Sequence, residues 1–285
     1  LLSCSGMRRK SYRCGFFVLT VILFGAFQDG PGFLLLEKDE VILDEQLQQR
    51  RAVLPFADPR VKRLEPRLLY SKEEDPFFFT CGIIDEGVGD AQVSLLWDEK
   101  AAKSRAKPNR GRGRRPKPKS VEVLFTSHIR ESGLPPVRKH LLLAIPRPAQ
   151  LERLLPRVAQ LGVGHVILCN ASKVDARYFR SHVMEPEYLR KFLALGLAGA
   201  EDPMMPTITV EPNLEDLLEA GRLQQIIPGK VSRVVAHPTP LNDEESVAAT
   251  TEEWDQVLIA IGPEAGWEES ELEMFAAADF RAVSL

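Results

Sequence analysis

The sequence lacks the grouped cysteines and histidines of a disulfide framework or a zinc site. Its four cysteines, Cys4, Cys14, Cys81 and Cys169, are scattered without a CxxC pair. The chain also has no internal repeat and no GxxxxGK[ST] pattern, and the absence of this pattern argues against a nucleotide phosphate site. We therefore expect no metal centre, and a functional part that works in a reducing compartment.

Long hydrophobic runs are also scarce. The most marked one, Gly15–Phe27, is too short to span a bilayer comfortably. It follows a basic stretch made of Arg8, Arg9, Lys10 and Arg13. This order is typical of a signal peptide, so we expect residues 1–32 to be a targeting leader that is removed, and no stable membrane association of the mature protein. Because the sequence starts at Leu1, Met7 is a candidate start, and a wrongly assigned start or an anchoring helix remains an alternative.

An excess of positive charge lies in one segment, whereas the rest of the chain is net acidic. The net charge is -3, but nine lysines and arginines lie between Lys103 and Lys119 with no acid among them, so the rest of the chain carries -12. An acidic body with one basic segment is expected of a protein that contacts nucleic acid locally. The segment Ala101–Ser120 has no apolar residue beyond alanine, so we expect a solvated insertion that contacts phosphates or is merely a loop.

With 285 residues and 44% hydrophobic content, the chain is long enough for one large core or two modest ones. Short apolar runs separated by turn residues predict a small β domain over residues 33–135. Its expected strands are Phe33–Leu36, Val41–Leu43, Phe77–Ile84 and Gln92–Trp97, with a hairpin turn at Asp85–Asp90.

Residues 136–285 have a different pattern, in which strands and helices alternate. The expected strands are Leu141–Ile145, His165–Cys169, Val231–Ala236, Val257–Ile261 and Phe280–Leu285, and the expected helices are Leu151–Leu161, Pro186–Gly199 and Glu268–Ala278. This order predicts an α/β domain with a mainly parallel sheet.

Two of these strands end in residues suited to a ligand site. One runs into His237 and Pro238, and the other into Gly262–Trp267. Ligands of open α/β sheets bind beyond the carboxyl ends of the strands, and glycines there let backbone amides approach a flat ligand closely. The alternative is a Gly-Pro turn that only ends a strand. Isolated histidines such as His140 and His165 are expected to pack rather than to bind a ligand, and Trp267 alone of the tryptophans remains open.

The segment Ala260–Trp267 resembles the GPEGG signature of the ribosomal RNA small subunit methyltransferase E family. Other segments resemble the same family in order and spacing: Phe33–Glu37, Asp58–Leu64, Gly82–Asp85, Arg147–Val163, Val174–Val183 and Gly196–Pro206. The resemblance covers about Phe33 to Leu285, broken by the basic insertion.

The resemblance implies a SPOUT trefoil-knot methyltransferase domain preceded by a small PUA-like β-barrel domain. It implies S-adenosylmethionine as cofactor, N3 of a uridine in bacterial-type small-subunit ribosomal RNA as the methylated atom, and a homodimer formed through the knot. By position, the cofactor would contact His237, Pro238, Ile261, Gly262, Pro263, Glu264, Gly266 and Leu285. Candidate RNA contacts are Arg60, Lys62, Arg63, Arg110, Arg112, Arg114 and Arg115. The family likeness does not identify a catalytic residue.

The chain departs from the family pattern at several positions. Ala198 and Gly199 replace a Glu-Gln pair, Met204 replaces an arginine, Ala265 replaces a glycine, and Tyr70 replaces an arginine of the β domain. The sequence ends at Leu285, before the family segment that completes the knot, so we expect cofactor binding to need a further segment. A catalytically inactive RNA-binding or ribosome-assembly relative is the alternative function. An organelle with bacterial-type ribosomes, with a plastid favoured, is the expected location, and the cytoplasm is the alternative.

Overall fold

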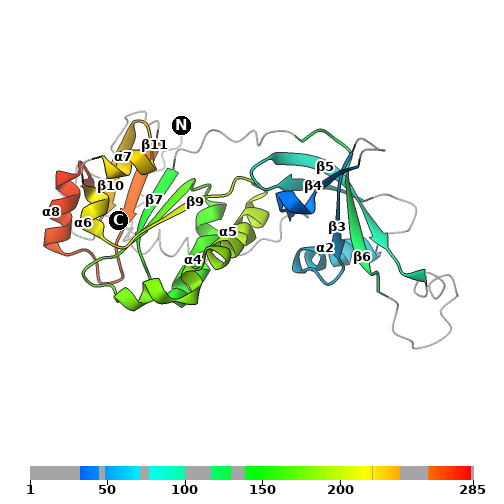
Figure 1. Cartoon of the computed structure of the whole chain (residues 1–285), viewed down its shortest axis with the longest axis horizontal. Helices are drawn as coiled ribbons and strands as arrows, with labels where there is room; N and C mark the ends of the chain where they lie inside the picture. The colour runs from blue at the N-terminus through cyan, green and yellow to red at the C-terminus, as the bar shows by residue number, and fades with distance from the viewer. Residues whose placement is uncertain are drawn as a thin grey trace, which may run out of the picture.

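The chain forms two sheets that belong to two domains lying side by side (Figure 1). This computed structural model describes residues 33–44, 49–70, 77–99, 117–129, 139–219, 221–237 and 256–283. The expected leader, residues 1–32, lies outside the described residues, as does most of the basic insertion. Within the described residues, no helix is long and apolar enough to cross a membrane.

The first sheet has the strand order β1-β4-β5-β6-β3-β2. Its strands are β1 (Leu34–Leu36), β2 (Ile42–Asp44), β3 (Gln49–Pro55), β4 (Phe77–Ile83), β5 (Gly87–Leu96) and β6 (Ser120–Phe125). β1 pairs with β4 in parallel, and the other pairs are antiparallel. The short helix η1 (Lys38–Glu40) joins β1 to β2, and α2 (Pro59–Tyr70) follows β3.

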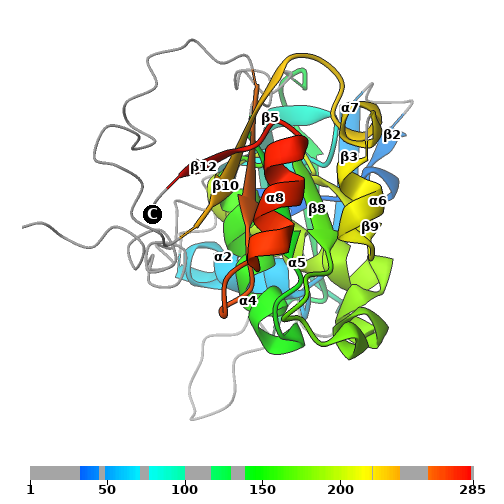
Figure 2. The ribbon, with the colours of Figure 1, turned by 90° about the vertical axis from the view of Figure 1, so that its left-hand side faces the viewer.

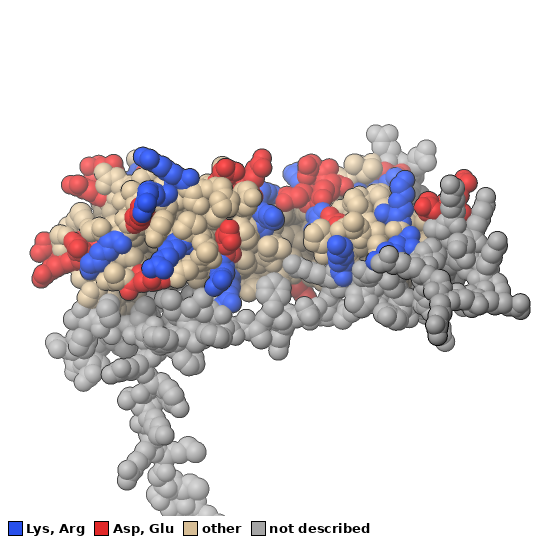
Figure 3. Space-filling view, turned by 90° about the horizontal axis from the view of Figure 1, so that it is seen from below, with Lys and Arg blue, Asp and Glu red and all other residues tan. Residues whose placement is uncertain are grey.

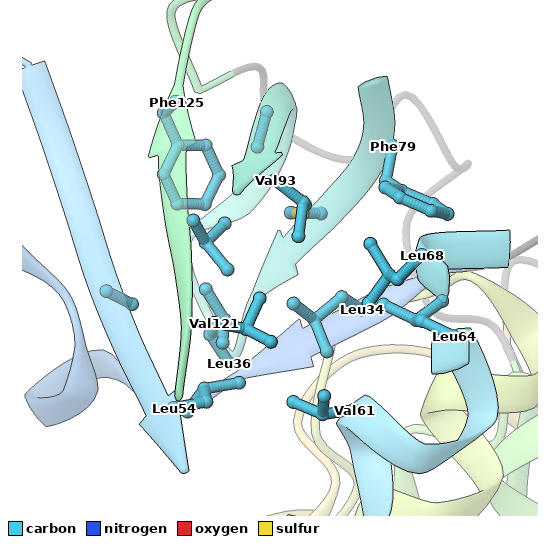
Figure 4. Close-up of a cluster of buried hydrophobic side chains, with 14 of the residues drawn as sticks. Leu34, Leu36, Leu54, Val61, Leu64, Leu68, Phe79, Val93, Val121 and Phe125 are labelled. Carbon is cyan, nitrogen blue, oxygen red and sulfur yellow. The ribbon is translucent and has the colours of Figure 1, made fainter. Parts of the chain in front are cut away.

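The core of this domain lies between the sheet and α2 (Figure 4). Alternate residues of a strand point to opposite faces, so every second strand residue is buried, as Val121, Val123 and Phe125 of β6 show. Helix α2 covers the same cluster with Val61, Leu64 and Leu68, spaced three and four apart on one face.

Several elements of the first domain differ from the sequence prediction. β3, β6 and α2 were not predicted, and Ser120 begins β6 instead of ending the insertion. The Lys119 amide donates a hydrogen bond to the Leu96 carbonyl at 2.8 Å, so the pairing with β5 begins one residue before β6. The hairpin turn covers only residues 84–86, and β5 starts at Gly87, earlier than the predicted Gln92.

The second sheet is entirely parallel, with the order β12-β10-β11-β7-β8-β9. Its strands are β7 (Lys139–Ala144), β8 (His165–Cys169), β9 (Thr207–Glu211), β10 (Val231–Ala236), β11 (Gln256–Ile261) and β12 (Arg281–Val283). Its helices are α4 (Pro148–Gln160), η2 (Ala176–Arg180), η3 (His182–Met184), α5 (Pro186–Ala200), α6 (Leu214–Leu218), α7 (Arg222–Ile226) and α8 (Glu269–Ala277). The predicted α/β domain with a parallel sheet is therefore confirmed, although β9, α6 and α7 were not predicted.

Helices cover both faces of this sheet (Figure 2). On one face, Leu141 and Leu143 of β7 pack with α4 and α5. On the other face, Leu142 and Ala144 pack with α6, α7 and α8. Burial on both faces explains why the strands read as continuous apolar runs.

The two domains share packing across their boundary. Leu35 of β1 and Ile84 belong to the same buried cluster as α4 and α5. The amide of Asp85 donates to Pro203 at 3.0 Å, and its carboxylate accepts the Met205 amide at 3.0 Å. The β domain is therefore tied to the second domain by apolar contact and by the hydrogen bonds of Asp85.

Candidate cofactor site

The carboxyl ends of β12, β10, β11 and β7 meet at one edge of the parallel sheet. Ala236 is the register partner of both Ile261 and Val283, and Ile261 is also the partner of Leu143. His237 follows β10 directly, and its amide donates to the Val283 carbonyl at 3.0 Å. The structure therefore brings His237, Ile261 and Gly262 together at the edge where a ligand of this sheet type binds.

The segment after β11 forms a tight turn. The Gly266 amide donates to the Pro263 carbonyl at 2.8 Å, and Gly266 has a φ of 75°. This conformation favours glycine, because a side chain would meet steric strain there. Ala265 is exposed and is not among the residues with positive φ, so its backbone accepts alanine without strain.

Trp267 fills the space beneath Gly262. Its side chain is 4% exposed and meets Phe275 edge to face with ring centroids 4.8 Å apart. A Cβ on Gly262 would lie 2.9–3.1 Å from three atoms of the indole ring. Trp267 is thus a packing residue, and Gly262 is needed so that the chain can pass over it.

Two buried polar atoms on this edge lack a hydrogen-bond partner within the described part of the chain. They are Oδ1 of Asn170, just beyond β8, and Nε1 of Trp267. Buried polar atoms are almost always bonded, so these two atoms are exceptions. The tight turn and the glycine that follows β11 suit a flat polar molecule that approaches the backbone closely.

Side chains from two other elements hold the turn in place. Glu264 accepts a hydrogen bond from Gln150 of α4, and Arg147 lies 3.9 Å from its other oxygen. Lys173, beyond β8, donates to the Ala265 carbonyl at 3.3 Å. Sequence reasoning missed Gln150 and Lys173, because no spacing pattern marks them and only the parallel sheet brings them to the turn.

Two of the expected cofactor contacts, Pro238 and Leu285, lie outside the described residues. The knot also remains a prediction, since residues 238–255 and 284–285 are not described. Among the described residues, no group of three or more metal-ligating side chains could hold a metal ion.

Arg60, one of the expected RNA contacts, is held inside the β domain. Its guanidinium donates to Glu40 at 2.6 and 2.7 Å, to Asp58 at 2.8 Å, and to the Leu35 carbonyl at 3.2 Å. The hydrogen bond from Arg60 lowers the pKa of Asp58. Burial opposes ionisation of Glu40, but the bonds from Arg60 and from the Glu37 amide lower its pKa overall. The geometry gives Arg60 a structural role.

The remaining RNA candidates are exposed or not described. Lys62 is exposed on α2, while the side chain of Arg63 and the four insertion arginines lie outside the described residues. On the face shown in Figure 3, lysines and arginines are interspersed with aspartates and glutamates. In the first domain, Lys38 and Arg50 both pair with Glu86. RNA contact by Lys62, Arg63 and the insertion therefore stays a prediction.

A cavity of about 240 Å³ lies at the opposite, amino-terminal edge of the second sheet. His140 and His165 line it, but each is already bonded: His140 to Gln256 at 2.8 Å and His165 to Thr209 at 2.7 Å. Burial lowers the pKa of both histidines, because it disfavours the charged imidazolium. Nδ1 of His140 is nevertheless buried without a hydrogen-bond partner among the described residues.

The second domain matches a known protein family. Residues 134–285, more than half of the chain, match the RNA methyltransferase domain family. The chain is 27% identical over 252 residues to ribosomal RNA small subunit methyltransferase E of Treponema pallidum (strain Nichols), covering 88% of this chain and 82% of that protein.

Two solved structures share the fold. One is ribosomal RNA small subunit methyltransferase E of Neisseria gonorrhoeae bound to S-adenosyl methionine, with a TM-score of 0.58, 14% identity, and coverage of 89% of this chain and 88% of that one. The other is a methyltransferase of Legionella pneumophila in complex with the same cofactor, with a TM-score of 0.57, 14% identity and the same coverage. Each match spans both domains of the chain.

Proposed function

Because this chain belongs to the RNA methyltransferase family typified by ribosomal RNA small subunit methyltransferase E, we propose that it methylates N3 of a uridine in bacterial-type small-subunit ribosomal RNA with S-adenosylmethionine as methyl donor. The observation that carries the proposal is the Gly262–Gly266 turn beside His237 at the carboxyl edge of the parallel sheet. The relatives that share this fold include two with the cofactor bound.

The residues at this edge suit the cofactor. We expect His237, Pro238, Ile261, Gly262, Pro263, Glu264, Gly266 and Leu285 to surround it. When bound, the cofactor supplies a methyl group carried on a sulfonium cation. The task of the protein is to hold that group and the target base in line, because orientation and exclusion of water account for much of the rate of such a transfer. Backbone amides near Gly262 can bind the polar edge of the cofactor without a charged side chain.

The proposed substrate, small-subunit ribosomal RNA, is the one that the name of the Treponema pallidum relative specifies. Uridine N3 is a weak nucleophile until its proton is lost, so the site must favour that loss at a base turned out of its helix. We further propose that the first domain is a PUA-like RNA-contacting module. There Lys62 is an exposed cation, and the basic insertion would supply charge for the phosphates.

The alternative function is an inactive RNA-binding relative, which the departures at Ala198, Gly199 and Met204 favour. A transfer assay separates the two. Full-length protein is incubated with radiolabelled S-adenosylmethionine and small-subunit RNA that lacks the modification. The RNA is then digested, and its nucleosides are separated by liquid chromatography and identified by mass spectrometry. We expect label in 3-methyluridine. Label in another nucleoside would overturn the uridine N3 assignment, and RNA binding without label would favour the inactive relative.

A further inference from the structure

Glu271 is a buried carboxylate next to the proposed cofactor turn. It is 2% exposed and lies in the first turn of α8. One oxygen accepts the Glu268 amide at 2.7 Å, which caps the helix. The other accepts the Ser172 amide at 2.7 Å and the Ser172 hydroxyl at 3.2 Å. Helix capping uses only the first oxygen.

The second oxygen joins two segments that the sheet does not join. Ser172 follows β8 and Glu268 follows the turn after β11, and β7 lies between these two strands in the sheet. Strand pairing therefore does not hold the segment after β8 against the segment after β11. Within the described residues, the other side-chain link is the longer Lys173 bond to Ala265 at 3.3 Å.

We propose that Glu271 is a positioning residue, which fixes the Gly262–Trp267 turn against the segment after β8 and so sets the shape of the cofactor site. A carboxylate suits this role, because both of its oxygens face donors and each hydrogen bond to a charged acceptor is stronger than a neutral one. The consequence for cofactor binding rests on the proposed function, whereas the link between the two segments does not.

The test uses Glu271→Gln, with Glu269→Gln as the matched control, because Glu269 is exposed on the same helix turn. A glutamine has one acceptor oxygen for two backbone donors, so one of the two bonds is lost. We expect amide hydrogen exchange of residues 262–267 and 171–173 to rise about tenfold in the variant without ligand, as loss of a charge-assisted bond predicts, with β7 unchanged.

Cofactor binding is measured on the same proteins by calorimetry. We expect the affinity for S-adenosylmethionine to fall about tenfold in Glu271→Gln and to stay unchanged in Glu269→Gln. Wild-type exchange and wild-type affinity in Glu271→Gln would overturn the proposal. If the wild-type protein itself does not bind the cofactor, the proposed function fails, while the exchange result still decides the link.

A second variant covers the case in which Glu271→Gln does not fold. Ser172→Ala removes only the side-chain hydroxyl and its 3.2 Å bond to Glu271. We expect about threefold faster exchange at residues 262–267 with an unchanged melting temperature, as for the loss of one weak bond. Unchanged exchange in this variant would contradict the proposal independently.

Discussion

At the scale of single residues, Gly262 and Ala265 lie in the same turn, but only the second position has room for a side chain. A Cβ on Gly262 would collide with the indole of Trp267, which is packed against Phe275 and cannot retreat. Ala265 is exposed and already carries a side chain without strain. The glycine of the family pattern is therefore required at the first position, whereas alanine is accepted at the second.

We predict that Gly262→Ala destabilises the protein by about 2 kcal/mol, as for an overpacked core site, and weakens S-adenosylmethionine binding about tenfold. Ala265→Gly serves as the control and should leave the affinity unchanged. Urea denaturation and calorimetry measure the two quantities. Equal affinity of Gly262→Ala and wild type would show that the turn does not shape the site.

Arg60 and Lys62 are near neighbours on α2 with different environments. We predict that Arg60→Ala costs about 2 kcal/mol of stability at neutral pH, because two partly buried carboxylates lose their cation. Lys62→Ala should change stability by less than about 0.5 kcal/mol and instead weaken RNA binding and its dependence on salt. RNA binding that is unchanged in Lys62→Ala would remove this residue from the interface.

The effect of Arg60 should depend on pH. Glu40 and Asp58 have lowered pKa values in the folded protein, so their contribution is present above their unfolded pKa values and is lost as the pH falls through the folded ones. We therefore expect the stability difference between wild type and Arg60→Ala to be constant near neutral pH and to shrink below about pH 4. Urea midpoints measured from pH 7 down to pH 3 test this, and a gap that widens in acid would contradict it.

At the scale of elements, α4 and α5 cross unusually closely. A Cβ on Gly196 of α5 would lie 2.0 Å from the backbone oxygen of Pro156 in α4, whereas a Cβ on Gly199 would meet only the end of the flexible Gln160 side chain. We predict that Gly196→Ala lowers the free energy of unfolding by about 2 kcal/mol or more. Gly199→Ala should be neutral or slightly stabilising, because alanine favours a helix by up to about 1 kcal/mol. Equal urea midpoints for the two variants would mean that the helices can separate freely.

Sequence patterns identified the elements of the second domain better than those of the first. Buried parallel strands such as β7 and β8 are short apolar runs bounded by turn residues, and the amphipathic helices α4 and α5 show their period clearly. β3, in contrast, begins with Gln49, Arg50 and Arg51, whose side chains pair at the surface, so its start carries no apolar signal.

The candidate site was predictable only in part. The glycine turn could be located because parallel strands place their carboxyl ends at one edge. The contacts of Glu271, Lys173 and Gln150 could not, because each joins residues about 90 or more positions apart in the sequence. No local spacing encodes such a pairing.

At the scale of the whole molecule, the two domains are expected to unfold together. Ile84 is 3% exposed and packs into the cluster around α4 and α5, so Ile84→Ala should cost about 3 kcal/mol and reduce amide protection in the second domain as well as in the first. The Glu37–Arg190 ion pair between the domains is partly exposed, so Arg190→Ala should cost at most about 1 kcal/mol. Loss of protection confined to the first domain in Ile84→Ala would show that the domains unfold separately.

A calorimetric titration of the full-length protein with S-adenosylmethionine tests directly whether the turn after β11 is a cofactor site. We predict saturable binding of one cofactor per chain, weakened in Gly262→Ala and retained in Lys62→Ala, because the first residue shapes the cofactor turn and the second lies in the other domain. Absence of binding up to a cofactor concentration of about 1 mM, or equal affinity of wild type and Gly262→Ala, would contradict a cofactor site at the turn after β11.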